Sequence, residues 1–216
     1  MDQIAFNAAV YARDVYDKNF GIVVEKDDQK CILVDDEQNN TLYVTFRGSY
    51  NLKNWERDFT FIPVNRSYAG YVHKGFADAL ETILPSIRLL ITYKFKDRKL
   101  VVSGHSLGGA VAQLFGIYFL NRKPMVVTMG CPKLYNRFSS VMKPSHIRIA
   151  NSDDPVPKPL GLMYKHFQTE YVEINDHDLF ASKVLNVEGI NPFDHSSERY
   201  ISKLQKMYPQ FTIPTL

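Results

Sequence analysis

Hydrophobic residues recur along this chain at two spacings, one typical of helices and one typical of strands. Over residues 3–17 the apolar positions fall three or four residues apart, as on one face of a helix. The segment 76–91 repeats that spacing, with Pro85 inside it as a predicted kink. The apolar positions are Ile4, Ala8, Tyr11 and Val15 in the first segment and Phe76, Leu80, Ile83, Leu84, Ile87 and Ile91 in the second. Both segments are predicted to be helices.

Short runs rich in β-branched residues predict the strands. Two early runs are separated by the polar turn 36–40 and form a predicted hairpin, and later runs alternate with helical segments before a closing helix at about 194–207. This order predicts an α/β fold, with a mostly parallel central sheet and helices on both faces, in a single domain spanning residues 1–216. The predicted strands are 21–25, 30–35, 41–46, 100–102, 125–129, 146–150 and one around 172–174.

Charge and hydropathy restrict the class of protein. A net charge of +3 does not favour a nucleic-acid partner. The first residues lack the basic and apolar regions of a signal peptide, and the most apolar run, 110–120, is too short for a membrane span and is interrupted by Gln113. We therefore expect no transmembrane anchor and a cytoplasmic location, with secretion as the alternative, and we expect a monomer. Cys31 and Cys131 are expected to be free thiols, with one long-range disulfide as the alternative.

The segment Gly104-His-Ser-Leu-Gly108 places a serine between two glycines, where a predicted strand gives way to a helix. In a nucleophile elbow the serine takes a sparsely allowed backbone conformation, and the residues two before and two after it come so close that glycine fits best. We therefore predict that Ser106 is a nucleophile, with an ordinary tight turn as the alternative. The side chain of His105 is expected to point away from the serine oxygen and to be structural.

A serine nucleophile needs an imidazole to take its proton and a carboxylate to orient that imidazole. In this type of fold the base follows the acid along the chain. His146 and His166 lie at predicted strands and His177 in a polar loop, which leaves His195 at the start of the closing helix as the predicted base.

The acid is expected where a strand ends, because such sites form at the carboxyl edge of a parallel sheet. Asp153 and Asp154 both follow the predicted strand 146–150. Their spacing does not choose between them.

Together, several segments resemble the class 3 lipase family, the filamentous-fungal triacylglycerol lipases. The resemblance covers most of the chain from about residue 40 and implies an α/β-hydrolase fold with a short helical lid. The segments are Val44–Ser49 with Asn54–Pro63, Val72–Phe76, Gly104–Gly109, Asp154–Pro157 and Asp194–His195.

This resemblance also implies roles for individual residues. It places the catalytic acid at Asp154 and the base at His195. It implies that Ser49, through its backbone N–H and hydroxyl, and Leu107, through its backbone N–H, form the oxyanion hole. In the family the segment after Ser49 is a lid.

The apolar residues Leu52, Trp55 and Phe59 fall on one side of that segment. On their spacing alone they predict an ordinary amphipathic surface helix. The resemblance implies instead that they cover the acyl groove in water and face lipid when the lid opens.

The expected reaction is hydrolysis of a lipid ester, such as an acylglycerol, at a lipid–water interface through an acyl-enzyme, without metal or organic cofactor. Activity should fall in acid, because a protonated His195 cannot act as a base. The alternatives are a phospholipase A1, a feruloyl-type esterase on the same fold, and a non-catalytic binding module.

Overall fold

A sheet of seven strands runs through the computed structural model, which describes residues 1–49, 62–136, 142–158, 164–174 and 195–216. The strand order is β1-β2-β3-β6-β7-β9-β11. The first three strands pair antiparallel, and all later neighbours pair parallel. The strands are β1 (Ile22–Lys26), β2 (Gln29–Asp36), β3 (Thr41–Phe46), β6 (Lys99–His105), β7 (Met125–Met129), β9 (Ser145–Asn151) and β11 (Glu170–Ile174).

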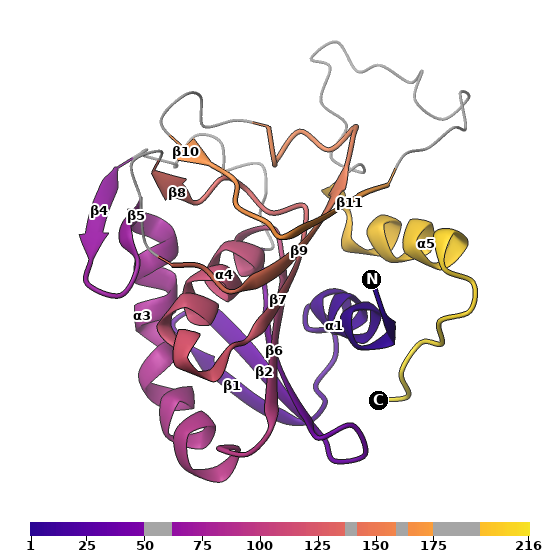
Figure 1. Cartoon of the computed structure of the whole chain (residues 1–216), viewed down its shortest axis with the longest axis horizontal. Coiled ribbons are helices and arrows are strands. Elements are labelled where there is room, and N and C mark those ends of the chain that lie inside the picture. The colour runs from indigo at the N-terminus through magenta and orange to yellow at the C-terminus, as the bar shows by residue number, and fades with distance from the viewer. Residues whose placement is uncertain (50–61, 137–141, 159–163, 175–194) are drawn as a thin grey trace.

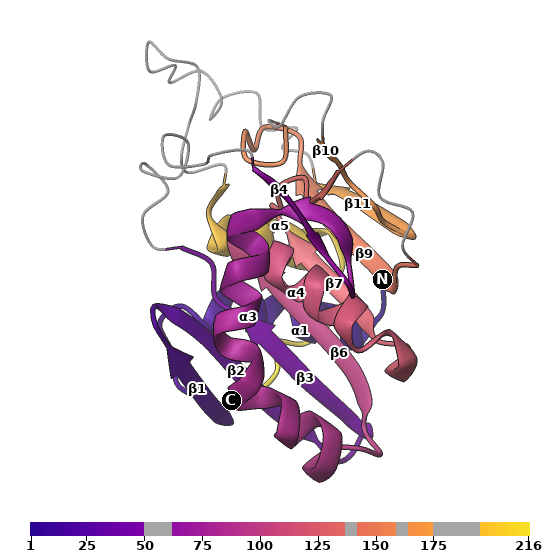
Figure 2. The same cartoon turned by 90° about the vertical axis from the view of Figure 1, so that its left-hand side faces the viewer.

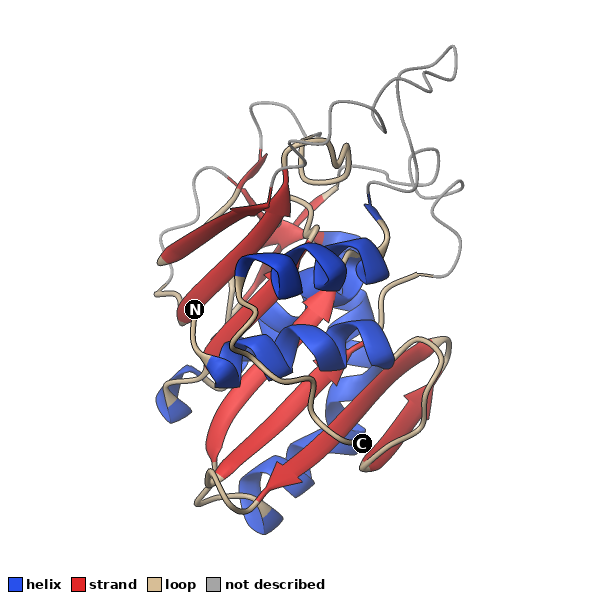
Figure 3. Ribbon diagram, turned by 90° about the vertical axis from the view of Figure 1, so that its right-hand side faces the viewer, coloured by secondary structure: helices blue, strands red, loops and turns tan. Residues whose placement is uncertain are grey.

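Helices cover both faces of this sheet (Figure 1). On one face α1 (Gln3–Asp14) contacts β6, β7 and α5 (Ser197–Met207). On the other face α3 (Lys74–Leu89) packs on α4 (Leu107–Tyr118), which contacts β6 and β7. Figure 3 shows α1 and α5 lying side by side over the strands. The predicted mostly parallel sheet with helices on both faces is confirmed.

The sheet is covered on both faces, and this explains the continuous apolar run in β6. Val101 packs in the core beneath α1 and α5, whereas Val102 packs in the core beneath α3 and α4. Successive side chains of a strand point to opposite faces, so a strand covered twice is apolar at consecutive positions. This continuous run is what the sequence displays at residues 100–102.

A second, smaller sheet lies beside the main one (Figure 2) and was not predicted from the sequence. Its strand order is β10-β8-β5-β4. Its strands have only two to four residues, which is too short for an alternating pattern to stand out. They are β4 (Pro63–Arg66), β5 (Gly70–His73), β8 (Tyr135–Asn136) and β10 (Tyr164–Lys165).

The predicted helices form with small changes in length. The N-terminal helix ends at Asp14 rather than 17, and the closing helix begins at Ser197. Pro85 lies inside α3, and a five-residue π-helix, η1 (Leu90–Lys94), follows directly after the end of α3. A single 3-10 turn, η2 (Leu120–Arg122), follows α4.

Within the described residues, no helix combines the length and the apolar character that crossing a membrane requires. Cys31 and Cys131 are both buried free thiols, so the predicted thiol form is confirmed and the alternative disulfide is wrong.

Candidate functional site

Ser106 lies at the turn between β6 and α4, in a backbone conformation that few residues other than glycine adopt. Its φ is 58° and its ψ is −130°. Two glycines make this turn sterically possible. A Cβ on Gly104 would lie 2.2 Å from the carbonyl carbon and oxygen of Gly108, and a Cβ on Gly108 would lie 2.2 Å from the carbonyl oxygen of Phe46. The sequence prediction of a strained strand-to-helix turn around Ser106 thus matches the backbone in detail.

Asp154 lies just beyond β9, fully buried, and accepts three hydrogen bonds. Its Oδ1 accepts from the backbone N–H of Val156 at 2.8 Å. Its Oδ2 accepts from the hydroxyl of Tyr200 at 2.7 Å and lies 2.7 Å from Nδ1 of His195. A buried carboxylate needs such partners, and these three bonds hold the carboxyl group of Asp154 in one orientation.

His195 is 1% exposed and lies at the start of the final helical segment. Since Nδ1 is held by Asp154, the other ring nitrogen, Nε2, is the one available to a neighbouring group. Among the described residues, Nε2 of His195 and Oγ of Ser106 are both buried and both lack a hydrogen-bond partner. These are the two atoms between which a proton would move if the residues act as a nucleophile and its base.

Gly130, immediately after β7, allows the acid and the histidine to approach each other. Its φ is +54°, and a Cβ there would lie 2.8 Å from Oδ2 of Asp154 and 3.0 Å from Nδ1 of His195. Glycine is therefore required for space as well as for backbone conformation.

Tyr200 links the site to α5. Its hydroxyl donates to Asp154 and accepts from the backbone N–H of Asn151 at 3.0 Å. Burial, and then the neighbouring Asp154 carboxylate, raise the pKa of Tyr200 well above its usual value. The phenol therefore stays protonated and remains a hydrogen-bond donor. Lys203, one turn later in α5, donates to Oδ1 of Asn151 at 3.0 Å.

The side chain of His105 takes part in a different set of contacts from its neighbour Ser106. Nδ1 of His105 lies 3.0 Å from the hydroxyl of Tyr16, and its ring packs on that of His195. Burial, and then His195, hold the pKa of His105 well below its usual value, so its ring is neutral.

The two predicted oxyanion residues flank the elbow. Leu107 follows Ser106 directly and begins α4, so its backbone N–H belongs to the unpaired first turn of a helix. Ser49 follows Gly48, whose added Cβ would lie 3.2 Å from Cβ of Ser106. The predicted lid residues Leu52, Trp55 and Phe59 lie outside the described residues.

Two other candidate histidines, His146 and His166, make hydrogen bonds elsewhere in the fold. His146 is buried and its ring nitrogens lie 2.8 Å from Oγ1 of Thr128 and 2.5 Å from the carbonyl oxygen of Phe167. His166 has its Nε2 2.9 Å from the carbonyl oxygen of Pro157. His177 lies outside the described residues. Within the part of the chain that the structure describes, no group of three histidine, cysteine, aspartate or glutamate side chains could hold a metal ion.

Sequence reasoning missed three residues of this site: Tyr200, Gly130 and Tyr16. Tyr200 lies five residues after His195 in a predicted helix, and Gly130 directly follows a predicted strand. Both positions fall in predicted elements or next to them. Their contacts with Asp154 and His195, however, depend on packing between distant segments, which the sequence pattern does not contain. Tyr16 comes from the opposite end of the chain and had no local signal.

Comparisons with known proteins identify the family of the chain. The sequence model of the family described as lipase (class 3) matches residues 43–163, which is more than half of the 216 residues. The chain is 34% identical over 178 residues to secreted mono- and diacylglycerol lipase 1 of Fusarium solani, covering 72% of this chain and 51% of that protein. It is 26% identical over 176 residues to a chloroplastic phospholipase A1 of Arabidopsis thaliana, covering 73% of this chain and 25% of the relative.

The fold is also found among solved structures. One is a triacylglycerol lipase described as having a serine-protease triad at its catalytic centre. It is 26% identical, with a TM-score of 0.65, over 88% of this chain and 89% of that one. The chain thus spans nearly all of this lipase but about half the length of the Fusarium relative.

Proposed function

This chain belongs to the class 3 lipase family, and we propose that it is a serine carboxylester hydrolase whose substrates are acylglycerols. The observation that carries the proposal is the buried pair of Asp154 and His195, 2.7 Å apart, packed around the elbow that presents Ser106. A hydroxyl on a strained turn, an imidazole with one free nitrogen and a buried carboxylate are the groups that acyl transfer requires.

In the proposed reaction Oγ of Ser106 attacks the ester carbonyl while Nε2 of His195 takes its proton. Asp154 stabilises the resulting imidazolium through the bond to Nδ1. His195 then passes the proton to the leaving alcohol, and the acyl-enzyme is hydrolysed by a water that His195 activates. Tyr200 and the backbone N–H of Val156 keep Asp154 oriented throughout.

The oxyanion of each tetrahedral intermediate would be bound by two backbone N–H groups, those of Ser49 and Leu107, with the Ser49 hydroxyl as a third donor. Support comes from their positions beside the elbow and from the first-turn N–H groups of α4, which favour negative charge. One oxyanion donor is worth on the order of 10²–10³ in rate.

Acylglycerols are the proposed substrates because the Fusarium relative is named as a mono- and diacylglycerol lipase. Leu52, Trp55 and Phe59 would form the apolar side of a lid and bring the site to a lipid–water interface. A phospholipase A1 activity is the second candidate, favoured by the Arabidopsis relative of that name.

A panel of substrates tests both candidates. Hydrolysis of a triacylglycerol, a monoacylglycerol and phosphatidylcholine is compared, above and below the concentration at which each aggregates. We expect the acylglycerols to be preferred, and Ser106→Ala to lose about 10⁴-fold or more in kcat toward all of them. Preference for phosphatidylcholine would favour the second candidate. An undiminished rate in Ser106→Ala would overturn the proposal as a whole.

A further inference from the structure

The ring of His105 contacts the rings of His195 and Tyr200, the two side chains that bind the buried carboxylate of Asp154. Its centroid is 4.4 Å from that of His195, with the planes tilted by 36°. It is 5.8 Å from the ring of Tyr200, in an edge-on contact of 64°. His105 is itself only 3% exposed. His105, the residue next to the proposed nucleophile, therefore packs against the ring of the proposed base, His195.

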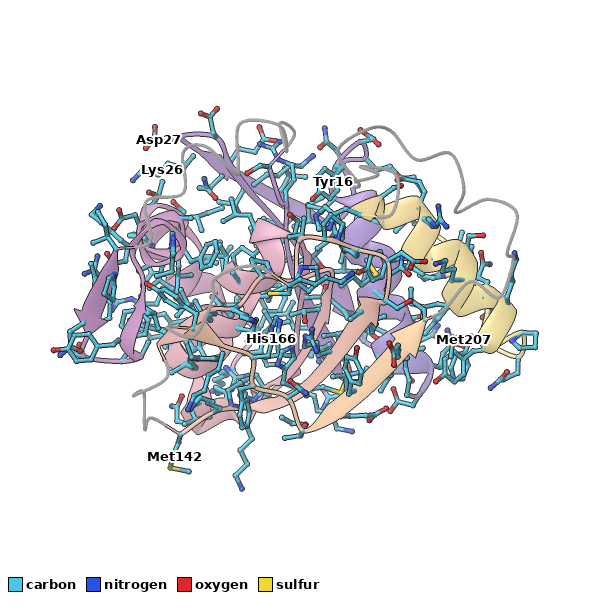
Figure 4. The ribbon with its side chains drawn as sticks, turned by 90° about the horizontal axis from the view of Figure 1, so that it is seen from above. Tyr16, Lys26, Asp27, Met142, His166 and Met207 are labelled. Carbon is cyan, nitrogen blue, oxygen red and sulfur yellow. The ribbon has the colours of Figure 1, made fainter. Side chains whose placement is uncertain are left out.

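A hydrogen bond fixes the orientation of His105 from outside the site. The hydroxyl of Tyr16, in the turn after α1, lies 3.0 Å from Nδ1 of His105. Figure 4 shows Tyr16 beside the end of α5 that follows His195 in the chain. Because one ring nitrogen is held in this way, the imidazole of His105 cannot rotate by half a turn without breaking a partly buried hydrogen bond.

The Tyr16 hydroxyl also contacts the segment that leads to Ser49. A Cβ on Gly48 would lie 2.2 Å from this hydroxyl oxygen and 2.7 Å from the carbonyl oxygen of His105. Any side chain at residue 48 would push Tyr16 away from His105. The absence of a side chain at Gly48 thus makes room for the bond between them.

We propose that Tyr16 and His105 are positioning residues, which hold the ring of His195 in line for proton transfer from Ser106. This proposal rests on the proposed function of the site. Asp154 fixes only one atom of the His195 ring, and a ring held at one atom can still tilt. Packing against His105 restricts that tilt, and small errors in the placement of a catalytic group are costly in rate.

The chemistry of His105 suits this position. In the reaction His195 becomes positively charged, and a second charge 4.4 Å away would oppose it. Burial lowers the pKa of His105, so its ring stays neutral and can face the imidazolium without repulsion. An apolar side chain of the same size could pack there, but it could not be held in place by Tyr16.

The substitution Tyr16→Phe removes the hydroxyl and keeps the ring, which contacts the ring of His105 edge-on. We expect kcat for a soluble nitrophenyl ester to fall about tenfold, with KM changed by less than twofold, because substrate binding is untouched. Tyr11→Phe in α1, five residues earlier in the chain, is the matched control, since Tyr11 is buried against Tyr43 and its substitution should leave both constants unchanged.

A double-mutant cycle tests whether Tyr16 acts through His105. In a His105→Phe background, Tyr16→Phe should change kcat by less than twofold. An equal loss in both backgrounds, or a Tyr16→Phe enzyme with the wild-type kcat, would overturn the inference. A loss confined to KM or to thermal stability would also do so, since it would mean a purely structural role.

A second measurement does not depend on turnover or on the folding of His105→Phe. In ¹⁵N spectra of the histidine rings, Tyr16→Phe should shift the signals of both His105 and His195, and Tyr11→Phe should shift neither. Unchanged His195 signals would contradict the inference. If Ser106→Ala keeps full activity, the proposed function fails instead, and the ring spectra still decide whether Tyr16 and His105 position His195.

Discussion

Ser106 and His195 stand out in the sequence as the candidate nucleophile and base because each has a local signal. The serine lies between glycines at the end of an apolar run, and the histidine lies at the start of a helix. Spacing alone left the acid open between the adjacent Asp153 and Asp154, and only the family resemblance of Asp154–Pro157 favoured Asp154. The structure distinguishes them by burial: Asp153 is exposed, whereas Asp154 is 0% exposed and faces His195. Which of two neighbours turns inward depends on the packing of α5, which spacing does not encode.

Gly130→Ala should reduce both stability and activity. The positive φ alone costs about 1 kcal/mol or more, and the new Cβ would crowd Oδ2 of Asp154 and Nδ1 of His195. We expect a loss of about 2–4 kcal/mol in the free energy of unfolding and a kcat lowered about tenfold or more. Urea unfolding and ester hydrolysis measure the two effects.

Gly70→Ala is the control for backbone strain. Gly70 also has a positive φ, +66°, but is the first residue of β5, directly after the turn from β4. The Gly70→Ala variant should be less stable than the wild type, but its folded form should keep the wild-type kcat. If both variants keep full activity, then the close approach at Gly130 does not matter to the chemistry.

Tyr200→Phe removes one of the three donors to Asp154. The carboxylate would then be held less firmly and would orient His195 less well, so we expect kcat to fall about five- to tenfold. KM should stay the same. Tyr208→Phe, at the end of the same helix and stacked on Phe211, should have no effect on kcat. A full-rate Tyr200→Phe enzyme would show that Val156 and His195 suffice to orient Asp154.

Elements with a long or continuous apolar pattern were predicted well, and short ones were missed. β6 is apolar on both faces and α3 carries its apolar face over several turns, so both stand out from the sequence. The small sheet has a two-residue strand paired through Tyr135 with Val72 of β5. Its pairing is created by contacts between distant segments rather than by local preference, so no window of the sequence contains it.

The contact between α4 and β7 depends on a glycine inside the helix. A Cβ on Gly116 would lie 2.6 Å from Cγ2 of Val126 and 3.1 Å from the Pro144 ring. Gly116→Ala should therefore lower the free energy of unfolding by about 1–3 kcal/mol, although alanine is the better helix former. Chemical denaturation provides the measurement.

Gly75→Ala in α3 is the matched control for this prediction. The nearest atoms to its Cβ would be 3.4 Å away, in the ring of His73, which is ordinary contact. The helix preference of alanine should then leave stability unchanged or raise it by up to about 1 kcal/mol. If both glycine variants behave alike, the packing explanation for Gly116 is wrong.

The molecule as a whole was predictable because the alternation of strands and helices along the chain fixes a layered α/β architecture. A parallel pair such as β3 and β6 needs a covering connection, and right-handed crossovers leave few arrangements. The positions of distant side chains around the site depended on the packing of these layers, and they became visible only in the structure.

Acid should destabilise the protein through its buried histidines. Burial lowers the pKa of His146 to about 3, while an unfolded histidine titrates near 6.5. Between these values the unfolded chain binds the extra proton, so this contribution to stability is complete above about pH 6.5 and is lost as pH falls toward 3. The slope is at most about 1.4 kcal/mol per pH unit for this residue.

Unfolding in urea at pH 8, 7, 6 and 5 would measure this dependence. Wild type should show little change between pH 8 and 7 and a steady loss below. His146→Gln should be less stable at pH 7, because the two bonds to Thr128 and Phe167 are altered, but should lose less on acidification. An identical acid slope in the variant would rule out His146 as a source of the effect.

Reaction with a fluorophosphonate decides whether this chain contains an activated serine. We predict a single stoichiometric adduct in the wild type, located by mass spectrometry on the peptide that contains Ser106. Labelling should be lost in Ser106→Ala and slowed by orders of magnitude in His195→Ala, which cannot remove the serine proton. An unlabelled but folded wild type, or equal labelling of Ser106→Ala, would contradict a hydrolytic role for this site.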